Sequence, residues 1–467
     1  MTNLHKIIDK LKEKVSCLEA ENAKLRKALE VAKAKLGMNS SNSSKPPSSD
    51  PPNGAGGKPL DNDRKRSRGG QEGHPRHQRA LLSPESVTTT IEHLPNKCTH
   101  CNEKLERAQC DPEPIRHQII ELPKIEPDVT EHQCFSAKCK NCGKTTKAKL
   151  PADIQRDVFG PRMKAMVGLL GGKYRISKRG MVELLSDLFS VELALGSISK
   201  MEKFVSNAMS APYEEIRNHV HSSDKVHADE TSWRENKKKA WLWVASTLKG
   251  VLFMICSGRG KIHAQDLLGK DYTGIAHTDR WRGYDWIDVE HRQLCWAHLI
   301  RNFQGIVDRG GGGKNFGNDM LKLTNELFKQ WHRYQKGQIP SKVFRGRMQR
   351  LRSRVRSRLH RSLKSGVDHV ESMSRDLLRL EPAMWCFVYN EGVVPTNNRA
   401  EQDIRKGVLW RKVSFGTDSQ SGSRFAERIL TMSETCRKQK RNLFSFMTHL
   451  CEDFQENKPA PSLLSVN

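Results

Sequence analysis

Two aspartates occupy matching places in a region that predicts short β-strands. Asp229 ends the first of these strands, and Asp279 directly follows the last one. If those two strands are neighbours in a sheet, both carboxylates project at the same edge. Carboxylates so placed suit Mg²⁺, and a second ion would complete a clamp for in-line phosphoryl displacement. The predicted elements are, in chain order, strands at 226–229, 240–245 and 251–255, a helix at 262–268 and a strand at 274–278.

A third acid is needed for such a clamp, and Glu401 is the best candidate. Pro395 predicts the start of a helix just before it. Spacing alone leaves two structural explanations open: Asn398 and Glu401 are spaced as in a capping box, and Glu401 stands one helical turn before Arg405. Glu230 follows the first aspartate and should point to the opposite face if the strand persists.

Two Cys-x-x-Cys pairs predict a structural zinc site. Each pair presents two thiolates on one small turn, and two such turns complete a four-sulfur tetrahedral site. Scattered reduced thiols are the alternative, but a segment with so little apolar content needs a cross-link or a bound metal to fold. The expected ligands are Cys98, Cys101, Cys139 and Cys142. Rival ligands nearby are Cys110, Cys134, His100, His117 and His132.

The charge of the chain predicts a polyanionic partner. Among 467 residues, 80 Lys and Arg outnumber 53 Asp and Glu, which leaves a net charge of +27. Nucleic acid and an acidic membrane face both fit that charge. The N-terminus does not resemble a secretory signal, and no segment is long and apolar enough to span a membrane. Twelve cysteines are too sparse for a disulfide framework, so we expect a reducing, cytoplasmic location near DNA or RNA.

The N-terminal residues 1–37 carry a heptad pattern that predicts a self-associating coiled coil. A single Asn at a seam position, here Asn22, commonly fixes register and two-strandedness. One amphipathic helix packed within the chain is the alternative. The seam positions are Leu4, Ile8, Leu11, Val15, Leu18, Asn22, Leu25, Leu29 and Leu36.

Residues 38–80 are rich in Ser, Pro, Gly and basic residues, a composition that predicts a tether. The basic cluster Arg64–Arg68 either contacts phosphates or only keeps the linker soluble.

Two further regions predict helices. Residues 176–189 and 197–203 have the pattern of a helix-turn-helix, although any helical hairpin gives the same pattern. The long interval between Asp279 and Glu401 predicts an inserted helical domain. One of its helices, 342–364, carries ten Lys and Arg and no acid, so one face can pack while Arg350, Arg354 and Arg358 contact phosphates. Such a helix can also lie on a membrane, but the nearby acids favour DNA.

Several ordered motifs resemble the insertion-sequence-66 family of transposases over nearly the whole chain. The most specific set runs from Asp229 to Lys412. The motifs are Asn39–Asp50, Gly69–Pro75, Asp229–Trp233, Cys295–Phe303, Asn397–Glu401 and Arg411–Lys412. The resemblance implies a DDE transposase with an RNase-H-like core, and it assigns the three catalytic acids to Asp229, Asp279 and Glu401.

The same resemblance implies roles for residues around the acids. A Cys-x-x-His element follows the second acid in several DDE transposases, so His298 should contact the scissile strand or metal-bound water; a core-packed Cys295 and a hydrogen-bonded His298 are the alternative. Arg405, Arg411 and Lys412 are expected phosphate contacts. The aromatic residues near the acids either stack on an unpaired base or belong to the core; they are Trp233, Trp281, Tyr284 and Trp286.

Together these patterns predict an α/β RNase-H-like catalytic core with a helical insertion, preceded by a coiled coil, a zinc module and a helical DNA-binding region. The expected activity is cleavage at the ends of a mobile element and joining of the 3′-hydroxyl to target double-stranded DNA, using Mg²⁺ or Mn²⁺. A catalytically silent, zinc-dependent DNA-binding regulator and a nuclease that does not join are the alternatives. We expect a prokaryotic, nucleoid-associated homo-oligomer, with accessory proteins encoded by the same element.

The expected domain boundaries follow from these assignments. They are 1–37 for the coiled coil, 38–80 for the linker, 81–155 for the zinc module, 156–215 for the possible helix-turn-helix, 220–290 and 395–455 for the two parts of the core, 291–394 for the insertion and 456–467 for a tail.

Overall fold

The computed structural model describes residues 2–40, 42–43, 79–151 and 157–464. The chain divides into two compact units, one of residues 58–129 and the other of residues 1–57 and 130–467, and each is described by itself. Most of the predicted tether, including Arg64–Arg68, lies outside the described residues.

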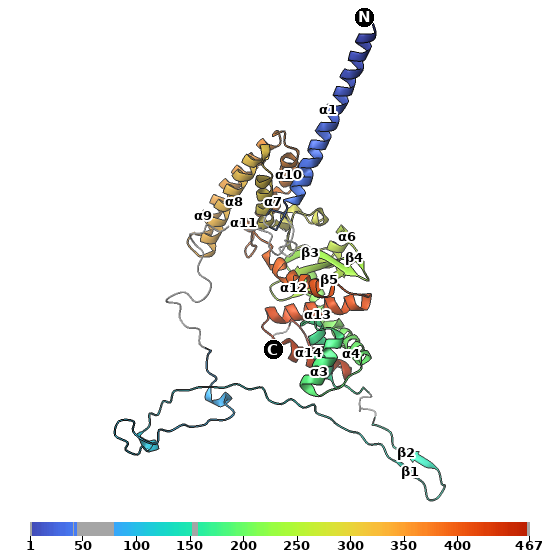
Figure 1. The fold of residues 1–467 in the computed structure, drawn as a ribbon, viewed down its shortest axis with the longest axis vertical. Coiled ribbons are helices and arrows are strands. Elements are labelled where there is room, and N and C mark those ends of the chain that lie inside the picture. The colour runs from blue at the N-terminus through green and yellow to red at the C-terminus, as the bar shows by residue number, and fades with distance from the viewer. Residues whose placement is uncertain (1, 41, 44–78, 152–156, 465–467) are drawn as a thin grey trace. The chain divides into compact units, whose positions relative to one another are not determined.

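A five-stranded mixed sheet forms the centre of the larger unit (Figure 1). Its order is β5-β4-β3-β6-β7; β3, β4 and β5 are antiparallel neighbours, whereas β6 and β7 run parallel to β3. The predicted meander, helix and fourth strand are therefore present. The elements are β3 (Lys225–Glu235), β4 (Lys238–Ser246), β5 (Val251–Cys256), α6 (Lys261–Leu268), β6 (Ile275–Thr278) and β7 (Arg292–Leu294).

The last strand extends the sheet beyond the boundary that the sequence predicted at residue 290. β7 has only three residues, two of them polar, yet all three are buried. Arg292 is satisfied inside by the Thr278 hydroxyl at 2.9 Å and by Asp285 at 2.8 Å. A strand this short carries no alternating pattern, which is why the sequence placed it in the helical insertion.

A tight turn between β3 and β4 fixes their register. Asn236 and Lys237 both have positive φ, at 48° and 61°, as a two-residue hairpin turn with the right twist requires. The long hairpin pairs Asp229 with Val244 and continues to Glu235 and Lys238. The strand that carries the first acid is thus held along its whole length.

Helix α13 (Gln420–Lys438) covers the free edge of the sheet at β5. Three of its side chains, each one turn apart, accept hydrogen bonds from backbone N–H groups of β5 that have no strand partner. The donor–acceptor pairs are Val251 to Thr435 at 3.1 Å, Phe253 to Thr431 at 3.0 Å, and Ile255 to Glu427. Because an uncovered edge strand invites pairing with another chain, this helix closes the sheet on that side.

Helix α12 (Asn398–Ser414) packs on β3 and β4 and so carries Glu401 to the sheet (Figure 1). Gly407 permits the close approach, since a Cβ at that position would lie 2.0 Å from Cδ2 of Leu242. α12 is joined to one large apolar core that includes Trp243, Phe253 and Ile429.

Within the described residues 157–224, four helices lie directly before the sheet in the chain. They are α2 (Pro161–Gly172), α3 (Lys178–Phe189), α4 (Leu195–Ala208) and α5 (Ser210–His221), and α14 (Leu443–Gln455) packs against α2. The first three share a small apolar core of their own, with Val167, Met181 and Ile198 fully buried. The two helices predicted at 176–189 and 197–203 are present as α3 and α4.

A helical domain stands between β7 and α12, as the sequence predicted. Its helices are α7 (Trp296–Arg309), α8 (Lys314–Gln335), α9 (Ser341–Ser362), α10 (Asp368–Arg379) and α11 (Glu381–Tyr389). They enclose a second apolar core, in which Trp331, Phe344 and Phe387 contact one another. The apolar stripe of α9 faces that core.

The N-terminal residues form one long helix, α1 (Thr2–Leu36). The seam residues whose side chains the structure describes are exposed, with Leu11 at 56% and Leu25 at 62%. Further on, β1 (Ser136–Lys138) and β2 (Thr145–Lys147) form a short antiparallel hairpin, while the smaller unit contains the 3-10 turns η3 (Pro84–Ser86) and η4 (Arg107–Gln109). No helix in the described ranges is long and apolar enough to cross a bilayer.

The carboxyl of Glu427 predicts a pH dependence of stability. Burial raises its pKa from 4.5 to about 7. Between these values the unfolded chain releases the proton and the folded chain keeps it, so stability falls as pH rises. Glu427→Gln remains neutral and can still accept from Ile255, so relative to the variant the native chain should lose on the order of 3 kcal/mol of unfolding free energy from pH 4.5 to 7.

Urea unfolding of both chains at pH 5 and pH 7 measures this difference. Glu183→Gln, on the exposed side of α3, is the control and should follow the native pH profile. Identical profiles for all three chains would contradict the role of Glu427.

Candidate active site

The parallel pairing of β3 and β6 places the two aspartates at equivalent positions. Val226 pairs with Ala276 and His227 with His277. Continuing that register two residues further brings Asp229 beside Asp279, at the edge where β6 ends. Glu401 lies in the first turn of α12, which packs on β3. The structure therefore brings the three predicted acids to one place.

The electrostatics of Asp229 show how close these groups are. Burial raises its pKa well above 3.8, and the negative charges of Glu230, Asp279 and Glu401 raise it further. The backbone N–H of Glu230, 2.9 Å from Oδ1, opposes that shift only in part. Buried carboxylates that repel one another bind divalent cations favourably, because the cation removes the repulsion. This donor set fits Mg²⁺ or Mn²⁺.

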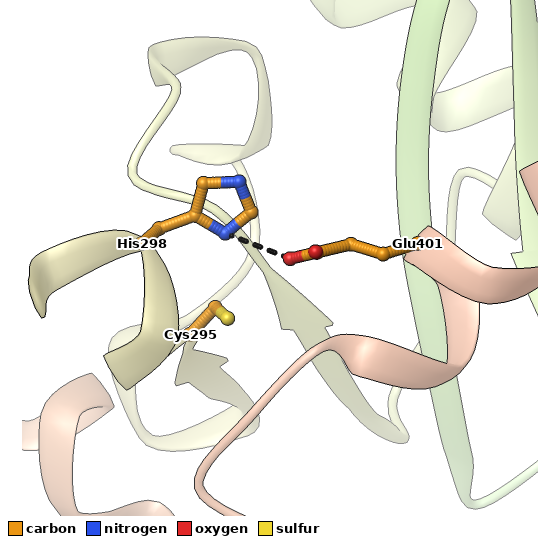
Figure 2. Close-up of side chains that lie close together, drawn as sticks. All are labelled: Cys295, His298 and Glu401. Atoms are coloured by element: carbon orange, nitrogen blue, oxygen red, sulfur yellow. Dashed lines mark ion pairs between the residues drawn. The ribbon is translucent and has the colours of Figure 1, made fainter. Parts of the chain in front are cut away.

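Glu401 makes two contacts with α7. Nη2 of Arg301 lies 3.2 Å from its Oε1. Nδ1 of His298 lies 3.3 Å from the same oxygen, without hydrogen-bond geometry (Figure 2). Neither structural alternative for Glu401 is formed: the N-cap of α12 is Asn397 and makes no side-chain cap, and no ion pair joins Glu401 to Arg405 in the described part of the chain.

His298 is a neutral, nearly buried imidazole. Its side chain is 11% exposed. Burial lowers its pKa below 6.5, and the charge of Arg301 lowers it further, while Glu401 and Asp279 act in the opposite direction. A neutral imidazole beside the acids can accept or donate a hydrogen bond without adding charge to the site.

Cys295, His298 and Glu401 also form a potential metal-binding group. Their ligand atoms lie within 4.8 Å of one another (Figure 2). The sequence offered only two of these ligands, so the structure adds the third. Two observations oppose ligation by Cys295: burial raises the pKa of its thiol to about 12, and its Sγ already accepts a hydrogen bond from the backbone N–H of Asn397 at 3.1 Å. We therefore assign Cys295 a hydrogen-bonding role and no metal to this group.

Glu230 takes partners of its own. Arg259 pairs with its carboxylate at 2.6 Å, and the Tyr284 hydroxyl donates to it at 2.8 Å. Burial, and next the charge of Asp279, raises its pKa to about 7. The sequence predicted that Glu230 points to the face opposite Asp229, yet its charge acts on Asp229, and that of Asp279 acts on it. Its pairing with Arg259 and Tyr284 anchors the turn that follows Asp279.

The aromatic residues near the acids divide into two groups. Trp233 and Tyr284 are fully buried in the core. Trp281 and Trp286 are only partly buried, and the guanidinium of Arg259 lies 4.6 Å from the centre of the Trp281 ring. Core packing thus explains the first pair, whereas the second pair borders the surface.

The predicted phosphate contacts differ in their exposure and in whether an acidic side chain already pairs with them. Arg411 is half-buried and donates to the Ser232 carbonyl at 2.5 Å, so it holds α12 to β3. Arg405 and Lys412 are exposed. On α9, Arg354 pairs with Glu326 at 2.6 Å and Arg358 with Asp319 at 2.8 Å. Arg350 is exposed and has no ion pair within the described ranges.

The two Cys-x-x-Cys turns have the same backbone. In the smaller unit, Cys98 N–H donates to Glu103 at 2.8 Å and its carbonyl accepts from Asn102, which has φ of 63°. In the larger unit, Cys139 N–H donates to Lys144 at 2.8 Å and its carbonyl accepts from Gly143, which has φ of 68°. In each turn, two backbone N–H groups lower the pKa of the first thiol.

The roles of three groups of residues near the acids were not predicted from the sequence. Arg301 stands three residues after His298, and that helical spacing was the available signal. Asn397 was named only as the first residue of the Asn397–Glu401 motif, without a role, and the pair His227–His277 gave no signal, because their partners lie far away in the chain: Asn397 Oδ1 is 3.1 Å from His227 Nδ1.

Comparison with known proteins gives the family. The model of the family described as "Transposase IS66 family" matches residues 157–425, and a family of unknown function (DUF6444) matches residues 2–80. The uncharacterized protein y4hP of Sinorhizobium fredii is 23% identical over 389 residues, which cover 73% of this chain and 68% of that protein. The first match spans more than half of the chain and includes all three acids, so the chain belongs to the IS66 family of transposases.

Proposed function

We propose that this transposase cleaves DNA at the ends of its element and joins the 3′-hydroxyl to target DNA at a DDE site. The observation that carries the proposal is the convergence of Asp229, Asp279 and Glu401 from β3, β6 and α12. Three antiparallel strands followed by two parallel ones, with a helical insertion before the third acid, suit the RNase-H-like core that the motifs imply.

The three carboxylates would hold two Mg²⁺ or Mn²⁺ ions, which supply an activated water, later an activated 3′-hydroxyl, and stabilisation of the leaving oxygen. The chain's own residues orient this site. Arg301 donates to Oε1 of Glu401, and His298, 3.3 Å from the same oxygen, would contact the scissile strand or metal-bound water. Glu230 and its partners fix the turn that presents Asp279.

Transposition in cells tests this function. The whole native locus with its flanking DNA, which includes any accessory proteins, is compared with Glu401→Gln. We expect movement by the native chain and none by the variant, because the amide keeps the shape and removes the metal-binding charge. Glu391→Gln, at an exposed turn, is the matched control and should move normally.

The other outcomes separate the alternatives. Movement with Glu401→Gln would refute the third acid. No movement by any chain that accumulates in cells would favour a silent DNA-binding regulator, and cleaved ends without joined product would favour a nuclease.

We also propose that Cys98, Cys101, Cys139 and Cys142 bind one structural Zn²⁺. The two matching turns and the lowered thiol pKa of Cys98 and Cys139 support this, since zinc binds the thiolate form.

Metal analysis of the purified full-length chain tests the zinc assignment. We expect about one zinc per chain, lost or strongly weakened in Cys98→Ser because a closed site needs all its ligands. Cys110→Ser is the control and should keep its zinc. Equal zinc content in both variants would rule out the ligand set.

We propose that exposed cations on α9 and α12 contact DNA. We also propose that α3 and α4 form a helix-turn-helix that binds DNA. Arg350, Arg405 and Lys412 are exposed, whereas Arg354 and Arg358 are neutralised by acids of α8. Among the residues predicted on α9, Arg350 is therefore the most available to a phosphate.

Salt-dependent binding to a duplex carrying the element's end tests this ranking. Arg350→Ala should reduce the slope of log affinity against log salt by about 1, because one phosphate contact is lost. Arg358→Ala, the matched control, should leave the slope nearly unchanged, since its guanidinium is already paired and mostly buried. Equal effects of the two substitutions would contradict the ranking.

Self-association is proposed through α1. Its exposed seam residues, including Leu11, Leu18 and Leu25, would be covered by a second copy of the same helix. The chain would act as an oligomer on double-stranded DNA, associated with the nucleoid of a prokaryotic cell, together with accessory proteins of the same element.

A further inference from the structure

A buried asparagine connects α12 to the strand of the first acid. Asn397 is 1% exposed and stands directly before α12. Its Nδ2 donates to the carbonyl of Ala228 at 2.7 Å. Ala228 is the residue before Asp229. The connection is therefore made one residue away from the carboxylate that it would orient.

The same asparagine is connected to the strand of the second acid through Cys295. The backbone N–H of Asn397 donates to Sγ of Cys295 at 3.1 Å. The backbone N–H of Cys295 in turn donates to the carbonyl of Thr278 at 2.9 Å. Thr278 is the residue before Asp279. Both strands are thus held at equivalent points by one chain of hydrogen bonds.

The third acid is connected to Asn397 by the helix itself. The N–H of Glu401 donates to the Asn397 carbonyl at 3.3 Å, the first hydrogen bond of α12. Every polar group of Asn397 is then engaged, because its Oδ1 lies 3.1 Å from Nδ1 of His227.

Two stacked histidines support the amide without adding charge. The rings of His227 and His277 are 3.8 Å apart and nearly parallel. Both rings are almost completely buried, with exposed fractions of 4% and 1%, and burial favours the uncharged form of an imidazole. In the tautomer with the proton on Nδ1, His227 donates to Asn397, and Nε2 of His277 accepts from the N–H of Val394 at 3.3 Å.

We propose that Asn397 is a positioning residue that sets the spacing of Glu401 relative to Asp229 and Asp279 through this junction with Ala228, Cys295 and His227. The proposal rests on the proposed function, since it concerns the geometry of that metal site. An asparagine is required because one side chain must donate to a carbonyl and accept from an imidazole; an aspartate cannot donate, and an alanine leaves buried groups unpaired.

The adjacent residue offers a matched control. Asn398 has the same side chain, is exposed and begins α12. Substitution there changes the same helix end without touching the junction. Any difference between the two variants therefore reports on the buried contacts of Asn397.

The test is Mn²⁺ binding to the zinc-loaded full-length chain, measured by the electron paramagnetic resonance signal of free Mn²⁺. The chains are native, Asn397→Ala, Asn398→Ala and Glu401→Gln, with circular dichroism and thermal unfolding as folding controls. We expect Asn397→Ala to weaken Mn²⁺ binding at the Glu401-dependent site by about 10- to 100-fold, the usual effect of removing an outer-shell partner, and Asn398→Ala to bind as the native chain does.

Each other outcome has a distinct meaning. If Glu401→Gln binds poorly while folded Asn397→Ala binds as Asn398→Ala does, the positioning role is overturned and the proposed function stands. If Glu401→Gln binds Mn²⁺ as the native chain does, the proposed metal site fails, and the positioning role fails with it. If Asn397→Ala does not fold, Cys295→Ala decides: it removes the acceptor of the Asn397 N–H, should weaken Mn²⁺ binding, and overturns the proposal if it folds and binds normally.

Discussion

Repulsion among partly buried carboxylates is the constraint on which the rest of this structure depends. The charges of Glu230, Asp279 and Glu401 all act on Asp229, and partial burial weakens the screening of these charges by water. A polypeptide brings such groups together only if its backbone is fixed beforehand, because each side chain alone would move away. The long β3–β4 hairpin, the parallel pairing with β6 and the close packing of α12 at Gly407 supply that rigidity.

The surroundings of the acids limit how much charge is left unbalanced. Glu230 is compensated by Arg259, and Glu401 by Arg301, whereas the buried His227 and His277 remain neutral. Cations thus contact the outer two acids, and the inner positions beside Asp229 hold uncharged groups. Asp229 and Asp279 keep their attraction for a divalent cation, because no cation of the described residues forms an ion pair with either carboxylate.

The sequence predicted the elements of this site better than its contacts. Strands β3 to β6, the helices of the insertion and the position of Asp279 after a strand follow from local patterns. The partners of Glu401 were not predicted. Sequence spacing suggested a capping box or an ion pair with Arg405, whereas in the structure Glu401 contacts His298 and Arg301 of α7. β7 was missed since three buried residues, two of them polar, have no periodicity, and Asn397 was missed because its partners are distant in the chain.

The two ends of the helical insertion lie side by side. This explains how Glu401 reaches the sheet although a long helical segment separates it from Asp279 in the chain. The N–H of Trp296, the first residue of α7, donates to the carbonyl of Pro395 at 2.9 Å. The chain thus leaves the sheet after β7 and returns beside its point of departure. The insertion encloses an apolar core of its own, to which β7 contributes Leu294, and α11 packs on β7. Because its two ends are joined, the size of the insertion has little influence on where α12 starts, and in the proposal above the junction at Asn397 and Cys295 sets the position of Glu401.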